Sequence, residues 1–149
     1  MPIARKYCIA GVGHTAYGKL PGRSAESLTV EAIHNALADA GIAKGEIDCV
    51  LTKAPTSAFQ MLYSARIAEC IGIVPKVTAT IDNAGASTAT AIVYAAQCIE
   101  EGLCSAAVIS YGDNPLTGSR TVYAEFGSGD SAPYGLFGAA GHYGLIAQR

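Results

Sequence analysis

The sequence predicts an α/β domain built around a mainly parallel sheet. Short apolar runs, expected as strands, alternate with longer segments of helical periodicity, and such units form parallel neighbours joined by right-handed crossovers. Half of the 149 residues are apolar and only 15% are charged, a balance typical of a globular, core-rich chain. A chain of this length can bury one sizeable core, so we expect a single domain over residues 1–149.

Each expected element follows from its residues. Four apolar runs end in turn-forming residues and are expected as strands, at 6–13, 47–54, 76–83 and 106–112. Four segments are expected as helices, at 24–40, 56–71, 85–101 and 136–149. Ser24 is the expected N-cap of the first helix and Gly41 its C-terminal stop. The remaining stretch, 113–133, is predicted to be a long loop that contains Arg120, Tyr123 and Phe126.

Composition argues against several classes of partner and site. The net charge is −2 and no basic cluster is interleaved with aromatic residues, so we expect neither nucleic acid nor an anionic membrane as partner. No apolar run approaches the roughly 20 residues of a membrane span, and residues 1–6 are too short for a signal peptide. The five cysteines have irregular spacing and no CxxC pair. These features predict a cytoplasmic protein without a metal site or a disulfide framework.

The third expected helix differs from an ordinary surface helix. From Ala86 to Cys98 it has no charged residue, and apolar residues lie all the way round it. A helix that is apolar on every side is buried on every side. One sheet cannot enclose it, so we expect a second sheet or a partner chain to cover it.

The start of this helix is the candidate functional site. A strand ends at Asn83, and Gly85, Ala86 and Ser87 open the helix. Free N–H groups and the positive end of the helix dipole meet there, which can lower the pKa of a thiol or hold an oxyanion. Alternatively, Asn83 and Ser87 only cap the helix and the small residues allow close packing. The sequence leaves both interpretations open.

Three segments resemble the thiolase superfamily. The run VTATIDNAGASTATAIVYAAQCIEEGLCSAAVISYG resembles the nucleophile segment, closest to sterol-carrier-protein type thiolases and acetyl-CoA acetyltransferase-like proteins of lipid metabolism. CIAGVGHTAYGKLPGRSAESLTVEAIHNALADAGI resembles their first strand, glycine-rich loop and first helix, and APYGLFGAAGHYGLIAQR resembles the helix before their last N-terminal strand. The resemblance implies two stacked α/β halves with a buried helix from each. Residues 1–149 would be the N-terminal half alone.

The resemblance also implies a chemistry that this chain does not fully support. Thiolases condense or cleave acyl-CoA thioesters through a cysteine at the start of the buried helix. Counting back from Gln97, that position falls on Gly85, which cannot form an acyl-enzyme. The histidine and second cysteine of the C-terminal half are missing. His14, His34 and His142 match none of these motifs; we expect His34 to be solvated and the other two to be structural.

Several hypotheses follow from this resemblance. The first is an acyl-CoA-handling protein of the cysteine-less branch, with aldolase-like chemistry on CoA thioesters as one form of it, that holds a thioester oxygen on the N–H groups of Gly85 and Ala86. Its ligand would be a coenzyme A thioester, with no covalently bound cofactor, beside a small acyl-CoA-binding partner protein. The alternatives are a non-catalytic binding or scaffold half-thiolase, and an acetyl-CoA C-acyltransferase fragment with Ser87 as surrogate nucleophile. The resemblance implies a homodimer through strand 76–83, and we expect this chain alone to be inactive.

Overall fold

The computed structural model describes residues 5–117, 132–135 and 138–148. Its longer elements are, in chain order, α1 (Ala25–Ala40), β1 (Cys49–Thr52), α2 (Tyr63–Ile71), β2 (Val77–Thr80), α3 (Ser87–Glu100), β3 (Ala107–Ser110) and α5 (Gly138–Ala147). Three short 3-10 turns accompany them: η1 (Lys44–Glu46), η2 (Ala84–Ala86) and η3 (Ala132–Tyr134). The predicted loop residues Arg120, Tyr123 and Phe126 lie outside the described residues. No helix in the described ranges is long and apolar enough to cross a membrane.

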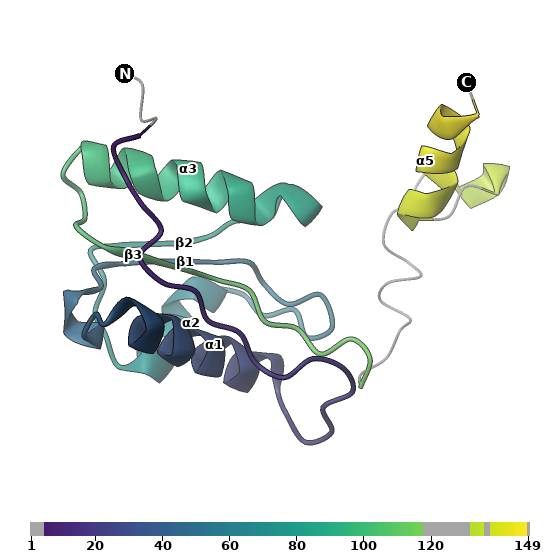
Figure 1. The fold of residues 1–149 in the computed structure, drawn as a ribbon. Coiled ribbons are helices and arrows are strands. Elements are labelled where there is room, and N and C mark those ends of the chain that lie inside the picture. Colours follow the sequence, from purple (N-terminus) through teal and green to yellow (C-terminus); the bar gives the residue numbers. More distant parts are fainter. Residues whose placement is uncertain (1–4, 118–131, 136–137, 149) are drawn as a thin grey trace.

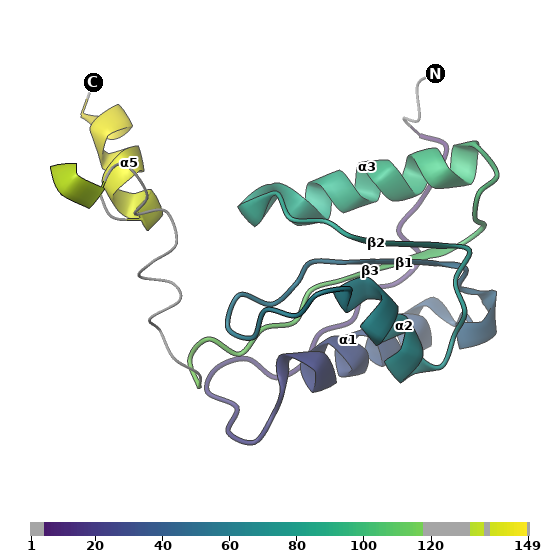
Figure 2. The ribbon, with the colours of Figure 1, turned by 180° about the vertical axis from the view of Figure 1, so that it is seen from behind.

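The strands form a parallel sheet in the order β2-β1-β3. Thr52 at the end of β1 lies between Thr80 and Ser110 in register, so the carboxyl ends of all three strands meet at one edge. Helices α1 and α2 cover one face of the sheet and α3 covers the other, whereas α5 stands apart in both views (Figures 1 and 2). The predicted α/β class with parallel strands is confirmed.

The two faces of the sheet carry separate cores. On the α1 and α2 side, the core centres on Ile33, Val50, Tyr63, Ile67 and Val108. On the α3 side, the buried residues are Cys49, Leu51, Ala91, Ala95, Cys98 and Cys104. Alternate residues of one strand point to opposite faces, which is why neighbouring positions in β1 belong to different cores.

Helix α1 begins and ends where its sequence signals predict. The Ser24 side chain accepts a hydrogen bond from the Ser27 N–H at 3.0 Å, which satisfies one of the free donors of the first turn. Gly41 follows the helix with a φ of 66°, the left-handed conformation that glycine adopts without a steric penalty. Both cap predictions are confirmed.

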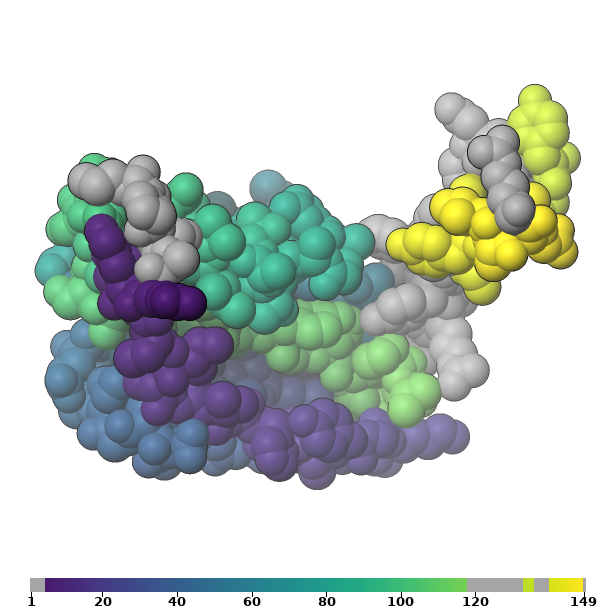
Figure 3. Space-filling model, turned by 45° about the horizontal axis from the view of Figure 1, so that its top comes forward, coloured from purple at the N-terminus to yellow at the C-terminus, as the bar shows by residue number. Residues whose placement is uncertain are grey.

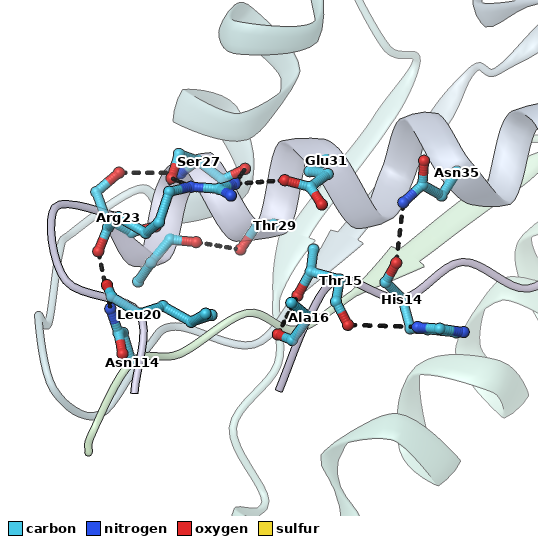
Figure 4. A network of polar contacts seen from close by, with 12 residues as sticks. His14, Thr15, Ala16, Leu20, Arg23, Ser27, Thr29, Glu31, Asn35 and Asn114 are labelled. Atoms are coloured by element: carbon cyan, nitrogen blue, oxygen red, sulfur yellow. Dashed lines mark hydrogen bonds and ion pairs between the residues drawn. The ribbon is translucent and has the colours of Figure 1, made fainter. Parts of the chain in front are cut away.

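The predicted first strand, 6–13, is wrong, because this segment is not part of the sheet among the described residues. It lies as extended chain against α1: a Cβ built on Gly13 would be 2.2 Å from the Ala32 oxygen, so only glycine allows this approach. The Asn35 side chain donates to the His14 oxygen at 2.9 Å (Figure 4). The Val12 N–H donates to the Asp39 carboxylate at 2.8 Å. The apolar run predicted a buried strand, but its hydrogen bonds with α1 leave Val12 70% exposed.

Helix α2 begins at Tyr63, seven residues after the predicted start at residue 56. The backbone N–H groups of Thr56 and Ser57 donate to the Asp113 carboxylate at 2.8 and 3.2 Å. Leu62, just before the helix, has a φ of 54°, which interrupts the helical backbone. The residues before Tyr63 therefore form a loop that is fixed to the end of β3.

Helix α3 is covered on one side only. Its buried residues Ala91 and Ala95 face the sheet, while Ile92, Val93 and Tyr94 are 41%, 47% and 39% exposed. A shallow groove of about 420 Å³ runs along the exposed side. Figure 3 shows this outer surface of α3 without a covering layer. The described part of the chain thus leaves the apolar helix half open, in agreement with the prediction that it needs a further layer.

Candidate site at the start of helix α3

The four predicted site residues lie in the turn that joins β2 to α3. Asn83 precedes η2, Gly85 and Ala86 are part of η2, and Ser87 is the first residue of α3. They are neighbours in sequence, so the turn itself brings them together. What the fold adds is the position of this turn at the carboxyl edge of the sheet, which is where open parallel sheets bind ligands.

Asn83 and Ser87 use their polar groups inside the turn. The buried Ser87 hydroxyl accepts from the Asn83 N–H and donates to the Ala84 oxygen, both at 2.8 Å. The Asn83 side-chain amide donates to the Thr90 hydroxyl at 3.0 Å. These contacts hold Asn83 and Ser87 within the turn, although neither side chain caps a free N–H group of η2 or α3 as predicted. They also disfavour Ser87 as a surrogate nucleophile, because its hydroxyl is buried and already hydrogen-bonded.

The two backbone donors proposed for a thioester oxygen are not equivalent. The Ala86 N–H already donates to the Asn83 oxygen at 3.0 Å. The Gly85 N–H has no hydrogen-bond acceptor among the described residues, and Gly85 itself is exposed. A Cβ built on Gly85 would meet no atom within 4 Å. The structure therefore leaves Gly85 as the donor of this pair, with room for a ligand beside it.

Sequence reasoning missed three charged or aromatic residues beside this turn. Lys53 Nζ lies 3.2 Å from the Asp82 carboxylate and 5.3 Å from the centre of the Tyr111 ring. The same Asp82 carboxylate accepts the Ala84 N–H at 3.0 Å. Lys53 and Tyr111 directly follow β1 and β3, and Asp82 closely follows β2. That shared position at strand ends is the sequence signal that could have found them.

The cysteines do not supply a thiol to this turn. All five are free, and Cys49, Cys98 and Cys104 lie in the core under α3. Burial raises the pKa of the Cys49 thiol to about 12 and also raises the pKa of Cys104. A thiol in such surroundings stays protonated and inert. Cys70 is exposed but lies on α2, across the sheet, where burial and a hydrogen bond to Glu26 raise its pKa.

The histidines also lie elsewhere. His34 is exposed on α1, as predicted. His14 is exposed in the segment beside α1, and its ring stacks on Tyr17 at a centroid distance of 5.7 Å. His142 lies in α5. Among the described residues, no group of histidine, cysteine and carboxylate side chains is arranged to hold a metal ion.

Comparison with known proteins identifies the family. Residues 7–129 match the family model of the thiolase N-terminal domain, so the chain belongs to the thiolase family. Among solved structures, the chain is similar to the Ltp2-ChsH2(DUF35) aldolase, with a TM-score of 0.64 and 28% sequence identity. That match covers 85% of this chain but only 31% of the aldolase chain. No curated protein matched the sequence.

The arrangement can bind a polar atom but does not provide the thiolase nucleophile. The η2 turn before α3 offers one exposed backbone donor, the Gly85 N–H, at the positive end of a 14-residue helix. Lys53 and Asp82 form an ion pair beside it. At the position where the resemblance places the catalytic cysteine, Gly85 provides only a backbone N–H. Within the described residues, then, this turn offers a hydrogen-bond donor but no thiol.

Proposed function

We propose that this chain is the N-terminal half of a thiolase-like protein that handles acyl-CoA thioesters without acyl transfer to cysteine. The observation that carries the proposal is Gly85, which is exposed and whose N–H has no acceptor in the described part of the chain. A thioester oxygen would accept this N–H at the start of α3. Coenzyme A thioester is thus the proposed ligand, and no covalently bound cofactor is proposed.

The proposed reaction type is aldolase-like rather than acyl transfer. The support is the structural similarity to a protein named an aldolase, together with the missing cysteine. Cleaving a carbon–carbon bond next to a thioester needs the thioester oxygen to be stabilised as an enolate forms, but it needs no acyl-enzyme. The groups that would move protons are not supplied by the described residues of this turn. The chain alone is therefore proposed to bind and not to turn over.

The first experiment asks whether an acyl-enzyme forms. After incubation with acetyl-CoA, intact-protein mass spectrometry should show no acetyl adduct on the chain. The Gly85→Cys variant is the matched positive control, because the position has room for a side chain and lies at the expected place of the nucleophile. A stable adduct on the unmodified chain would contradict the proposal.

The second experiment measures what the start of α3 does to a thiol. We expect the thiol introduced by Gly85→Cys to have a pKa below the ordinary value of about 8.5, because helix N-termini favour thiolates. The control is Gly144→Cys, an open position in the second half of α5. Both variants are made with Cys8→Ser and Cys70→Ser, which remove the exposed thiols. Alkylation rates against pH give both pKa values, and equal values would remove the electrostatic basis of the site.

A second candidate function is a non-catalytic binding or scaffold module. The observation in its favour is the uncovered side of α3, where Ile92 is exposed and Val93 and Tyr94 line a groove of about 420 Å³. Such a helix favours association with a further layer of protein. Light scattering discriminates between a monomer and an associated form, since a well-folded monomer contradicts this candidate.

A coupled thiolysis assay tests the remaining candidate, an acetyl-CoA C-acyltransferase fragment, and is expected to show no activity.

The partners and the cellular location of the chain are also proposed, on less direct support. A homodimer through residues 76–83 is consistent with β2, whose outer edge pairs with no strand in the described ranges. A small acyl-CoA-binding partner is consistent with the name of the similar aldolase, which joins Ltp2 to ChsH2(DUF35). Sterol-carrier-type lipid metabolism and a cytoplasmic location remain proposals, the second supported by five free cysteines.

A further inference from the structure

The residues that follow the three strands form a connected polar chain at the carboxyl edge of the sheet. Lys53 Nζ lies 3.2 Å from Asp82 and 5.3 Å from the centre of the Tyr111 ring. The side chain of Lys53 is only 16% exposed. Lysine is almost never buried without a partner. Here an ion pair and a cation–π contact hold the ammonium group in place.

Asp82 links Lys53 to the turn that precedes α3. Its carboxylate pairs with Lys53 and also accepts the Ala84 N–H at 3.0 Å. Ala84 has a φ of 48°, in the left-handed region that residues with a Cβ rarely adopt. Such a backbone persists only where surrounding contacts hold it. The carboxylate of Asp82 is one of those contacts, and Asp82 is itself 50% exposed and held by Lys53.

Lys53 also lines a small cavity at the first turn of α3. Together with Ser87 and Thr88 it lines a cavity of about 10 Å³, large enough for about one water molecule. The lysine is therefore linked to the turn through Asp82 and also faces the small cavity that Ser87 and Thr88 line. No other ammonium group of the described residues lines this cavity.

We propose that Lys53 is a positioning residue for the turn that opens α3. By holding Asp82 it keeps the Ala84 N–H bound and the left-handed backbone in place, which leaves the next donor, the Gly85 N–H, exposed. Use of that donor by a ligand rests on the proposed function. The link from Lys53 through Asp82 to Ala84 does not, so it can be tested without any ligand.

The test uses the thiol introduced by Gly85→Cys, in the background without Cys8 and Cys70, as a probe of the turn. Adding Lys53→Met should lower its alkylation rate at pH 7 about three- to tenfold, because Asp82 loses its counter-ion beside the thiolate. Lys53→Arg should restore the rate. The matched control is Lys76→Met, which breaks a 3.0 Å ion pair with Asp48 at the other end of the sheet and should leave the rate unchanged.

Amide hydrogen exchange distinguishes a role of Lys53 in positioning the turn from an effect of its charge on the thiol. If Lys53 positions the turn, exchange of the Ala84 amide accelerates in Lys53→Met and equally in Asp82→Ala, which removes the acceptor of the Ala84 N–H, and the double variant adds nothing. Asp82 is half exposed, so Asp82→Ala should fold even if Lys53→Met does not. Unchanged Ala84 exchange in either folded variant would overturn the proposal. Failure of the chain to bind acyl-CoA would leave these measurements unaffected, so the two proposals fail separately.

Discussion

The described helices bury the two faces of the sheet to different degrees. On the α1 and α2 face, Ile33 and Ile67 are 1% and 0% exposed, and the hydroxyls of Tyr63 and Thr29 hydrogen-bond to each other inside the core at 3.0 Å. On the other face, α3 buries one side and leaves Val93 47% exposed. The first face is a closed core made by this chain. The second is a helix that packs on the sheet with one side and is open on the other among the described residues.

The largest expected effect is a difference in stability loss between substitutions on the two faces of the sheet. Ile67→Ala on the closed face should lower the free energy of unfolding by about 2–5 kcal/mol, because it leaves a cavity in a packed core. Val93→Ala on the open face should cost less than about 0.5 kcal/mol in the isolated chain. Urea unfolding followed by circular dichroism measures both.

The relative size of these two effects is informative. Equal losses for Ile67→Ala and Val93→Ala would mean that α3 is already covered in solution, for example by a second copy. Repeating the measurement at several protein concentrations identifies that case, because the stability of an associated chain depends on concentration. A concentration-independent difference supports a monomer with one open face.

The sequence predicted the fold where local signals agree with the tertiary structure. The caps of α1 at Ser24 and Gly41 are local, and the structure confirms both. The parallel order of strands follows from their alternation with helices. The segment 6–13 was predicted wrongly because an apolar run does not show which neighbour its hydrogen bonds will reach. Its partners on α1, such as Asp39 for the Val12 N–H, are 27 positions away.

The candidate site was predictable in part for the same reason. Gly85 could be located by counting along a recognisable helix. Counting along one element could not locate Lys53 and Tyr111, because each is 29 positions from Asp82 in the sequence and they come together at this edge only when the strand ends align. The delayed start of α2 has a similar origin, since Asp113 binds the backbone of Thr56 from 57 positions away.

A second prediction compares the two ends of the sheet. At the amino end, Asp48 accepts the N–H groups of Ser105 and Ala106 at 2.8 and 3.0 Å and pairs with Lys76 at 3.0 Å. Partial burial raises the pKa of Asp48, but these hydrogen bonds and the Lys76 charge outweigh it and lower the pKa to about 2. Because the folded pKa lies below the unfolded one, Asp48 stabilises the fold above about pH 4 and loses this contribution as the pH falls toward 2.

The Asp48→Asn variant should therefore be destabilised by about 2 kcal/mol near neutral pH, and the difference from the parent chain should shrink as the pH falls from about 4 to about 2. Glu101→Gln, at an exposed carboxylate just after α3, is the control and should show little change. Urea midpoints across this pH range provide the measurement. A difference between Asp48→Asn and the parent that stays constant down to pH 2 would rule out the titration of Asp48 as its cause.

The smallest expected effect tests how closely the segment before α1 packs on the closed side. Gly13→Ala would place a Cβ 2.2 Å from the Ala32 oxygen, so either the segment or α1 must move. We expect a loss of about 1 kcal/mol, because the segment can lift away without opening the core. Gly45→Ala is the matched control, since its Cβ meets no atom within 4 Å. Trypsin should cleave after Lys19 faster in Gly13→Ala than in Gly45→Ala. Equal cleavage rates and equal stabilities would show that this segment is not packed on α1 in solution.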